Sequence, residues 1–228
     1  MQSLLICRTV GLDDKMSHEV ADIAGKVGIA AGNSAELNFH STDADPFGPD
    51  FDPMQAGCVV ARLDADAPDP GEVLDRLNER HSALSVVFLV DKPVAKAIVD
   101  VMRKGAFDVL EWPLEQGRLR ESIEQSLTAS VEKQRRLTEA QAAQRRLADL
   151  TAGERDVLQL MLSGKVNKSI ASRLGIALRT VEARRKRVFT KMGTRSLAEI
   201  AAVLNGAGLL FASGIVGLTG GGSPMLAH

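Results

Sequence analysis

Residues 150 to 204 read LTAGERDVLQLMLSGKVNKSIASRLGIALRTVEARRKRVFTKMGTRSLAEIAAVL, and this stretch decides the fold of the second half of the chain. Apolar residues recur in it at helical spacing and turn residues interrupt them at short intervals, which predicts four short helices. Asn167 is expected to cap the second helix, and Gly175 to begin the tight turn before the third. A hydroxyl and a carboxylate three residues apart satisfy amides that a first helical turn leaves unpaired. This spacing predicts capping boxes at Thr151 with Glu154 and at Ser196 with Glu199.

The third predicted helix, which extends to about Met192, combines an apolar stripe with dense positive charge. The stripe consists of Val181, Val188 and Met192. The cations, six within thirteen residues, are Arg179, Arg184, Arg185, Lys186, Arg187 and Lys191. The second helix of a helix-turn-helix enters the major groove of DNA, so this charge favours a DNA-reading helix over a solvated basic one. Residues 151–228 carry 11 Lys and Arg against 4 Asp and Glu, whereas the whole chain has a formal net charge of -1.

These residues resemble the LuxR-type helix-turn-helix at the C-terminus of FixJ/NarL-class response regulators. The resemblance is carried by Leu150, Thr151, Glu154, Val157, Leu158, Asn167, Lys168, Ile170, Ala171, Leu174, Gly175, Thr180, Val181, Glu182, Lys191, Met192, Gly193 and Ser196. The chain departs from the family at Ala177, where a capping Ser is usual, and at Arg184, where His is common. The resemblance implies a DNA interface that consists of Lys168, Arg179, Thr180, Glu182, Arg184, Arg185, Lys186, Arg187 and Lys191.

The first half of the chain alternates short apolar runs with helical patterns, which predicts an open α/β sheet. The runs SLLIC, GCVVA, LSVVFLV and AFDVL have strand length, and a fifth strand is expected near Ala35 to Asn38. Helices are expected over about Ser17–Val27, Gly71–His81 and Pro93–Lys104. The segment MRKGAFDVLEWPL, from Met102 to Leu114, resembles part of a response-regulator receiver domain. The resemblance implies a flavodoxin-like parallel five-stranded sheet with strand order 2-1-3-4-5.

A receiver of this kind requires two acids that hold Mg²⁺, an Asp that accepts the phosphoryl group, a hydroxyl and a Lys. By the resemblance, those positions carry Arg8 and Thr9, Arg62, Val90 and Trp112 here, which predicts a degenerate, pseudo-receiver domain. Arg62 is expected to pair with Asp64, Asp66 or Asp13. An alternative alignment makes Asp64 the acceptor, but it buries the Arg62 charge in a strand, and the hydroxyl and the Lys remain absent.

No metal or cofactor site is expected. The acidic stretch from Asp43 to Asp52 is interpreted as a surface loop, because its prolines and the absence of a terminal Glu argue against a calcium loop. Cys7 and Cys58 lie in apolar runs and are expected to be buried, reduced thiols. The N-terminal sequence has no basic region followed by a long apolar run, and no membrane-spanning segment is evident, which predicts a cytoplasmic protein.

A long polar helix is expected from about Glu115 to Asp149. It resembles the fifth receiver helix continued into a linker, and the linker is expected to be either a solvated spacer or a weak parallel dimer helix. After Leu204, the Gly-rich apolar segment is expected to be a flexible tail, with docking of Leu209 to Leu218 on a domain or a second subunit as the alternative. The predicted organisation is therefore a receiver-like domain at 1–120, a linker helix at 121–149, a helix-turn-helix domain at 150–205 and a tail at 206–228.

The function that these patterns favour is a sequence-specific transcriptional regulator, not an enzyme, that binds double-stranded DNA as a homodimer and does not depend on aspartyl phosphorylation. The alternative is an adaptor whose receiver-like domain binds a kinase or another regulator. A small ligand in the receiver-like domain is a third hypothesis, although the sequence contains no fingerprint for one.

Overall fold

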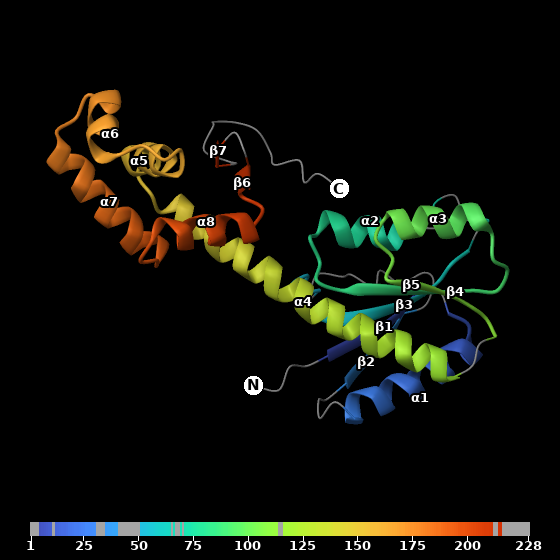
Figure 1. Cartoon of the computed structure of the whole chain (residues 1–228). Coiled ribbons are helices and arrows are strands. Elements are labelled where there is room, and N and C mark those ends of the chain that lie inside the picture. Colours follow the sequence, from blue (N-terminus) through green and yellow to red (C-terminus); the bar gives the residue numbers. More distant parts are fainter. Residues whose placement is uncertain are drawn as a thin grey trace. The chain divides into compact units, whose positions relative to one another are not determined.

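The computed structural model describes residues 5–10, 12–30, 35–40, 51–64, 66, 69, 71–113, 116–211 and 214–215. The chain divides into two compact units, Met1–Arg135 and Arg136–His228, whose elements are labelled in Figure 1. The boundary between the units falls inside helix α4, which spans Gln116–Ala148. The segment that the sequence assigns to a linker is thus the continuation of the last helix of the first unit.

The first unit contains a parallel sheet with the strand order β2-β1-β3-β4-β5. The strands are β1 (Leu5–Val10), β2 (Ala35–His40), β3 (Gly57–Arg62), β4 (Ser85–Val90) and β5 (Asp108–Glu111). The accompanying helices, besides α4, are α1 (Asp14–Ala30), α2 (Glu72–Glu79) and α3 (Ala95–Arg103). Because parallel strands connected by helices are covered on both faces, β3 and β4 are nearly continuous in apolar residues.

Successive residues of β3 and β4 point to opposite faces of the sheet and enter two separate cores. One core contains Cys58, Val60, Val87 and Leu89 and is closed by residues of α1 and α4: Val20, Ile23, Leu119, Ile123 and Leu127. The other contains Val59, Ala61, Val86, Phe88 and Val90 and is closed by residues of α2 and α3: Leu74, Leu77, Ala97 and Val101. Figure 1 shows α2 and α3 together over one face, with α1 and α4 on the other. Cys58 is buried, as expected, whereas the side chain of Cys7 lies outside the described residues.

The first half of α4 is a core helix, so the expectation of a solvated spacer is wrong for it. A row of serines faces the sheet: Ser122, Ser126 and Ser130 are all buried. The Ser130 hydroxyl donates to the carbonyl oxygen of Ala83 and accepts from the amide of Gly57, at 2.8 Å in both cases. Ser130, one of the polar residues that make this seam a poor coiled-coil pattern, is therefore explained by hydrogen bonds to backbone groups of the first unit, whereas the Ser126 hydroxyl donates to the carbonyl oxygen of Ile123 in α4 itself.

The second unit consists of the end of α4 and four short helices. These helices are α5 (Ala152–Leu162), α6 (Asn167–Leu174), α7 (Leu178–Met192) and α8 (Leu197–Gly206). Two short antiparallel strands follow, β6 (Leu210–Phe211) and β7 (Gly214–Ile215). In the core of this unit, α4 contributes Ala143 and Leu147. Helix α7 contributes Val188 and Met192, and α8 contributes Ile200 and Leu204. Both ends of α4 are therefore buried, each in the core of a different unit.

The helix boundaries confirm part of the expected capping and correct two points. The capping box at Thr151 is present, and the amide of Thr151 donates to Glu154 Oε2 at 2.9 Å. At Ser196 only half of the expected box forms: the amide of Glu199 donates to the Ser196 hydroxyl at 3.2 Å, but the Glu199 carboxylate accepts from the amide of Arg195 at 2.9 Å. Asn167 does not cap α6. It is the first residue inside that helix, the N-cap position belongs to Val166, and no side chain caps it.

The expectation of a flexible tail directly after the fourth helix is also wrong, because Leu209 is 6% exposed and belongs to the core of the second unit. Most of the acidic loop, residues 43–50, lies outside the described residues. The described part of the chain contains no cluster of three His, Cys, Asp or Glu side chains suited to a metal ion, and none of its helices is long and apolar enough to span a membrane.

Candidate nucleic-acid interface

Helices α6 and α7 form a helix-turn-helix around a small apolar core. Gly175 ends α6 in the left-handed conformation (φ +63°), which a residue with a Cβ adopts only with strain, and the amide of Ile176 bonds the carbonyl of Ala171 at 3.1 Å. Ile170 and Val181 pack together with Val157 and Met161 of α5. The turn therefore holds α7 across α5 with one face buried.

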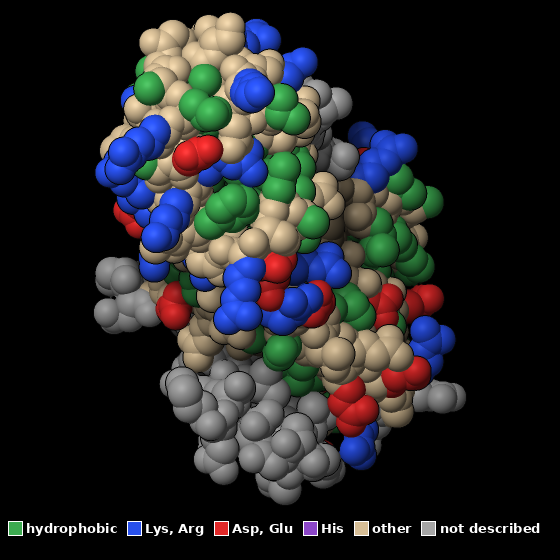
Figure 2. Space-filling view, turned by 60° about the vertical axis from the view of Figure 1, so that its left-hand side comes forward, with side chains coloured by type: hydrophobic (Ala, Val, Ile, Leu, Met, Phe, Trp, Pro, Cys, Tyr) green, Lys and Arg blue, Asp and Glu red, His purple; other side chains and the backbone are tan. Residues whose placement is uncertain are grey.

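The two faces of α7 separate apolar from charged side chains. Val181, Val188 and Met192 are fully buried, as expected. At about 100° per residue, the side opposite this stripe carries Arg179 and Lys186, with Thr180, Glu182 and Arg187 beside them. All five of these residues are exposed. In Figure 2, blue Lys and Arg side chains outnumber red acidic ones on the upper part of the surface.

The cations of α7 fall into two groups that the sequence does not distinguish. The side chains of Arg179, Lys186 and Arg187 make no hydrogen bond or ion pair with any residue that the structure describes. The other three are half-buried and engaged within the unit. The Arg185 guanidinium lies over the ring of Phe189, 6.0 Å from its centroid. Among the residues expected at the DNA interface, the cations of the first group and the exposed Lys168 on α6 present unpaired charge to a ligand.

Arg184 lies against α5. Its Nη1 is 3.4 Å from the carbonyl oxygen of Gly153, and a Cβ at position 153 would come within 2.6 Å of the guanidinium. Glycine at 153 therefore makes room for Arg184, which lies on the flank of α7 rather than on its outer face.

Lys191 makes contacts within the second unit and does not point freely into solvent. Its Nζ is 2.7 Å from Oε2 of Glu154, whose side chain is 3% exposed, and 2.9 Å from the carbonyl oxygen of Asp149. The hydrogen bond from Lys191 outweighs burial and, with the amide of Thr151, lowers the pKa of Glu154 below its usual range. A buried carboxylate with a charged donor is ionised at neutral pH, so this pair joins α5 to α7.

The N-terminus of α7 lacks a side-chain cap. Ala177 occupies the N-cap position in an extended conformation and makes no side-chain hydrogen bond, as its apolar side chain predicts. The first amides of α7 therefore point outward beside Arg179 and Thr180, with the positive end of the helix dipole.

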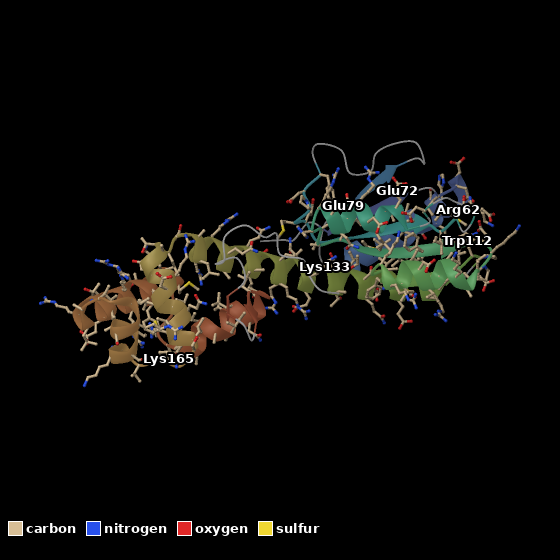
Figure 3. All side chains as sticks on the ribbon, turned by 90° about the horizontal axis from the view of Figure 1, so that it is seen from above. Arg62, Glu72, Glu79, Trp112, Lys133 and Lys165 are labelled. Atoms are coloured by element: carbon tan, nitrogen blue, oxygen red, sulfur yellow. The ribbon has the colours of Figure 1, made fainter. Side chains whose placement is uncertain are left out.

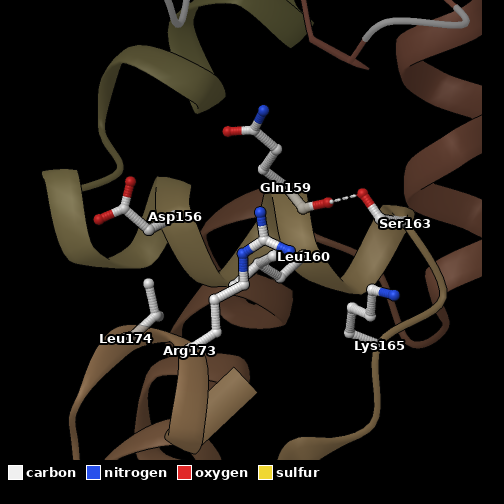
Figure 4. A pocket seen from close by; sticks show the side chains of 7 residues that line it. All are labelled: Asp156, Gln159, Leu160, Ser163, Lys165, Arg173 and Leu174. Carbon is white, nitrogen blue, oxygen red and sulfur yellow. Dashed lines mark hydrogen bonds between the residues drawn. The ribbon is translucent and has the colours of Figure 1, made fainter. Parts of the chain in front are cut away.

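A hollow of about 270 Å³ lies between α5 and α6 (Figure 4). It is lined by Asp156, Gln159, Leu160, Ser163, Lys165, Arg173 and Leu174. None of the residues expected to contact nucleic acid lines it, so the candidate interface is a convex helix surface and not this hollow.

The carboxyl edge of the sheet in the first unit carries the residues expected at a phosphorylation site. Arg62 is the last residue of β3, Val90 the last of β4, and Trp112 follows β5. Val90 is buried, Trp112 packs against the α1–α4 core, and its amide bonds the carbonyl of Val90 at 2.8 Å. Figure 3 labels Arg62 and Trp112 at the same end of this unit. Arg8 and Thr9 lie inside β1, which continues to Val10, and not after its end.

The expected partners of Arg62 are wrong. Its Nη2 pairs with Oδ2 of Asp91, directly after β4, at 2.6 Å. Two of the predicted partners accept hydrogen bonds from nearby backbone instead: Asp13 from the amide of Met16, and Asp64 from the amide of Asp66. Asp91 was missed, although it directly follows β4 and the predicted strand order, with β3 beside β4 in a parallel sheet, is the signal that could have found it. Arg62 is exposed at the strand end, so its charge is not buried in a strand, contrary to the cost expected for the alternative alignment with Asp64 as acceptor.

The fold and the outer face of α7 together define a class: a two-unit regulator with a receiver-like α/β unit and a DNA-binding helix-turn-helix. Residues 148–204 match the family model described as bacterial regulatory proteins, luxR family. The chain is 38% identical over 150 residues to the C4-dicarboxylate transport transcriptional regulatory protein DctR of Rhodobacter capsulatus, a match that covers 64% of this chain and 75% of DctR.

Two further comparisons cover more of the chain. It is 32% identical over 168 residues to the transcriptional regulatory protein FixJ of Bradyrhizobium diazoefficiens, which covers 74% of this chain and 82% of FixJ. The structure of the response regulator StyR superposes with a TM-score of 0.67 and 27% identity, over 89% of this chain and 98% of StyR. The chain belongs to the family of DctR and FixJ, the transcriptional regulatory response regulators with a LuxR-type DNA-binding domain.

Proposed function

We propose that α7 lies in the major groove of double-stranded DNA and reads sequence there, and that the receiver-like unit controls this binding without aspartyl phosphorylation. The observation that carries the first part is the group of exposed, unpaired cations Arg179, Lys186 and Arg187 opposite a fully buried stripe. A helix held by one apolar face presents its other face to the groove at a defined angle.

The exposed residues have distinct roles in this proposal. Lys186 points toward base edges or phosphates, and Arg187 lies at the flank, where it binds phosphate. Arg179 and Thr180 bind a phosphate beside the uncapped first turn of α7. Glu182, on the same face, accepts a hydrogen bond from a base amino group such as that of cytosine.

The remaining sequence-predicted residues take other parts. Lys168 on α6 is exposed and contacts phosphate. Arg184 and Lys191 position α7 through Gly153 and Glu154. Arg185 stacks on Phe189 and supports the helix edge. In this proposal the cations that face DNA in each copy are Lys168, Arg179, Lys186 and Arg187. The six cations of α7 therefore do not all contact DNA.

The dependence of DNA affinity on salt tests this interface. Four phosphate contacts per copy give a log-log slope of about -4, and loss of one lowers its magnitude by about one. Lys186→Ala and Arg187→Ala are therefore expected to flatten the slope, whereas Arg173→Ala, which removes an exposed cation from the hollow of α5 and α6, leaves it unchanged. Parent-like slopes in both α7 variants would contradict the assignment.

The second part of the proposal rests on the Arg62 and Asp91 pair. At the acceptor position a guanidinium has no nucleophilic oxygen, and its positive charge repels Mg²⁺. Val90 offers no hydroxyl and Trp112 no charge to a phosphoryl group. Control then passes to a partner, a ligand or the abundance of the protein. Incubation with acetyl phosphate and Mg²⁺ is expected to leave the intact mass and the DNA affinity unchanged. A phosphoryl group on an Asp, accompanied by tighter DNA binding, would refute this part.

We also propose that the protein binds DNA as a homodimer, because one helix-turn-helix reads only a short half-site and a two-fold operator matches a two-fold protein. Light scattering of the complex with a duplex that contains two half-sites is expected to give two copies per duplex. A single copy per duplex at saturation would count against it.

An adaptor role is the second candidate, favoured by exposed apolar side chains on the receiver-like unit at Val94, Val99 and Met102. Such side chains are typical of protein contacts when they lie together. The two candidates differ in one measurement. An adaptor retains its regulatory effect in cells when Lys186 and Arg187 are both replaced by Ala, whereas a DNA-binding regulator loses it.

A further inference from the structure

The last turns of α4 and α7 exchange hydrogen bonds. Nη1 of Arg146, on α4, donates to the carbonyl oxygen of Met192 at 3.1 Å. In the opposite direction, Nζ of Lys191, on α7, donates to the carbonyl oxygen of Asp149 at 2.9 Å. The last carbonyls of a helix have no partner within it, so each helix satisfies an acceptor that the other leaves open. We call this pair of contacts the α4–α7 clamp.

An apolar contact lies beneath the clamp. Leu147 and Leu150 belong to the same buried cluster as Val188 and Met192 of α7. Both the polar and the apolar contacts of this end of α7 thus involve the end of α4. The C-terminus of the proposed recognition helix is therefore held by the end of α4 as well as by Glu154 of α5.

The turn after α7 depends on the same arginine. Gly193 ends α7 in the left-handed conformation, at φ +66°, and the Arg146 guanidinium lies 3.7 Å from the place where a Cβ would be. The hydroxyl of Thr194, the next residue, is buried and finds no hydrogen-bond partner among the described residues. Among the described contacts, Arg146 therefore provides a side-chain hydrogen bond at this turn and Thr194 provides none.

The first half of helix α4 packs in the first unit. Its earlier residues Leu119, Ile123 and Leu127 lie in the sheet core, and Ser130 bonds two strand-end backbone groups. The helix is continuous from Gln116 to Ala148.

We propose that Arg146 is a positioning residue for DNA reading, which acts through the α4–α7 clamp on the last turn of the recognition helix. The inference rests on the proposed function, since it assumes that α7 reads DNA. Arg146 sets the orientation of the last turn of α7 and of the turn that follows, and it does not itself contact DNA.

The test uses the full chain with Arg146→Met, which removes the donor and keeps length and helix propensity. Arg145→Met is the matched control, because Arg145 is exposed on the same turn and its side chain has no partner among the described residues. Arg146→Lys is the rescue variant, since it retains a cationic donor. The probes are a duplex that the parent protein selects from a random-sequence pool and a duplex of unselected sequence.

Arg146→Met is expected to reduce the affinity ratio between the selected and unselected duplexes by about three- to tenfold, the loss expected from one hydrogen bond. The salt slope stays unchanged, because no phosphate contact is removed. Without DNA, amide hydrogen exchange at residues 190–195 is expected to become faster in Arg146→Met only. Arg145→Met behaves like the parent, and Arg146→Lys recovers most of the selectivity.

Three results would overturn the proposal. A flatter salt slope in Arg146→Met means that Arg146 is itself a phosphate contact. Equal loss of selectivity in Arg145→Met means that charge, not the clamp, is responsible. Parent-like selectivity with faster exchange means that the clamp is only structural. Failure of the proposed function is seen separately, as an unchanged salt slope in Lys186→Ala, and it leaves the exchange measurement without DNA valid.

Discussion

Replacement of Glu154 by Gln tests how much the helix-turn-helix depends on one buried charge. The carboxylate of Glu154 accepts from Nζ of Lys191 at 2.7 Å and from the amide of Thr151 at 2.9 Å. Glu154→Gln keeps the shape but removes the negative charge from the acceptor of both hydrogen bonds and ends the ion pair with Lys191, which costs about 2 kcal/mol of unfolding free energy. Lys191→Met leaves the carboxylate buried without its cation and is expected to cost more, about 3 kcal/mol.

The chain offers an internal control for this measurement. Its single Trp, Trp112, lies in the first unit, so Trp fluorescence follows that unit while far-UV circular dichroism also follows the helical one. In urea, Glu154→Gln is expected to lower the midpoint of the helical transition and to leave the fluorescence transition in place. Glu199→Gln is the same substitution at the exposed start of α8, where the carboxylate accepts from the amide of Arg195, and it is expected to cost less, about 1 kcal/mol.

The pH dependence gives a second, independent signature. Because folding lowers the pKa of Glu154 below its unfolded value of about 4.5, its contribution is present above that pH and is lost as the pH falls through the folded pKa. The helical unit of the parent should therefore lose stability below about pH 5 more steeply than that of Glu154→Gln. The same urea midpoint in both proteins at pH 7, or the same slope with pH, would refute the assigned role of the pair.

Ser130→Ala is expected to destabilise the first unit by about 2 kcal/mol in urea unfolding followed by Trp fluorescence, because it leaves the buried amide of Gly57 and the carbonyl of Ala83 unpaired; exposed Thr128→Ala should cost far less. Thr194→Val should be neutral or stabilising by up to about 1 kcal/mol in the helical transition, since it removes an unsatisfied hydroxyl, and a loss above 1 kcal/mol would mean that the hydroxyl has a partner. Arg62→Ala should cost less than about 1 kcal/mol, because its pair with Asp91 is solvent-exposed, and should leave the protein unphosphorylated by acetyl phosphate when intact mass is measured.

Local patterns in the sequence were sufficient for the elements of both units. The apolar run over β4, the buried stripe of α7 and the turn at Gly175 each follow from residues within a few positions of one another. Burial periodicity and turn chemistry are local properties, so the pattern alone placed the helix-turn-helix and its buried face. The failed cap at Asn167 is a case where a favourable residue lies one position too late.

Contacts between distant residues required the tertiary structure. The sequence treats the cations of α7 alike, but Arg184 and Lys191 meet Gly153 and Glu154 across the core, while Arg179 and Lys186 remain unpaired toward solvent. Which cation finds a carboxylate depends on how α5 and α7 cross, and no local pattern contains that angle.

The same reason explains the other differences. The ion pair of Arg62 with Asp91 exists because β3 and β4 are neighbours in a parallel sheet and end at the same edge. The polar residues of α4 are typical of a solvated spacer in the sequence, but in the folded chain Ser130 is buried and bonds the backbone of Gly57 and Ala83. Sequence alone determined which residues form helices and strands and which faces are apolar, because those preferences act within a few residues. Only the folded chain decided which polar groups are paired and which remain free to bind DNA, because pairing depends on groups that folding brings together from far apart in the chain.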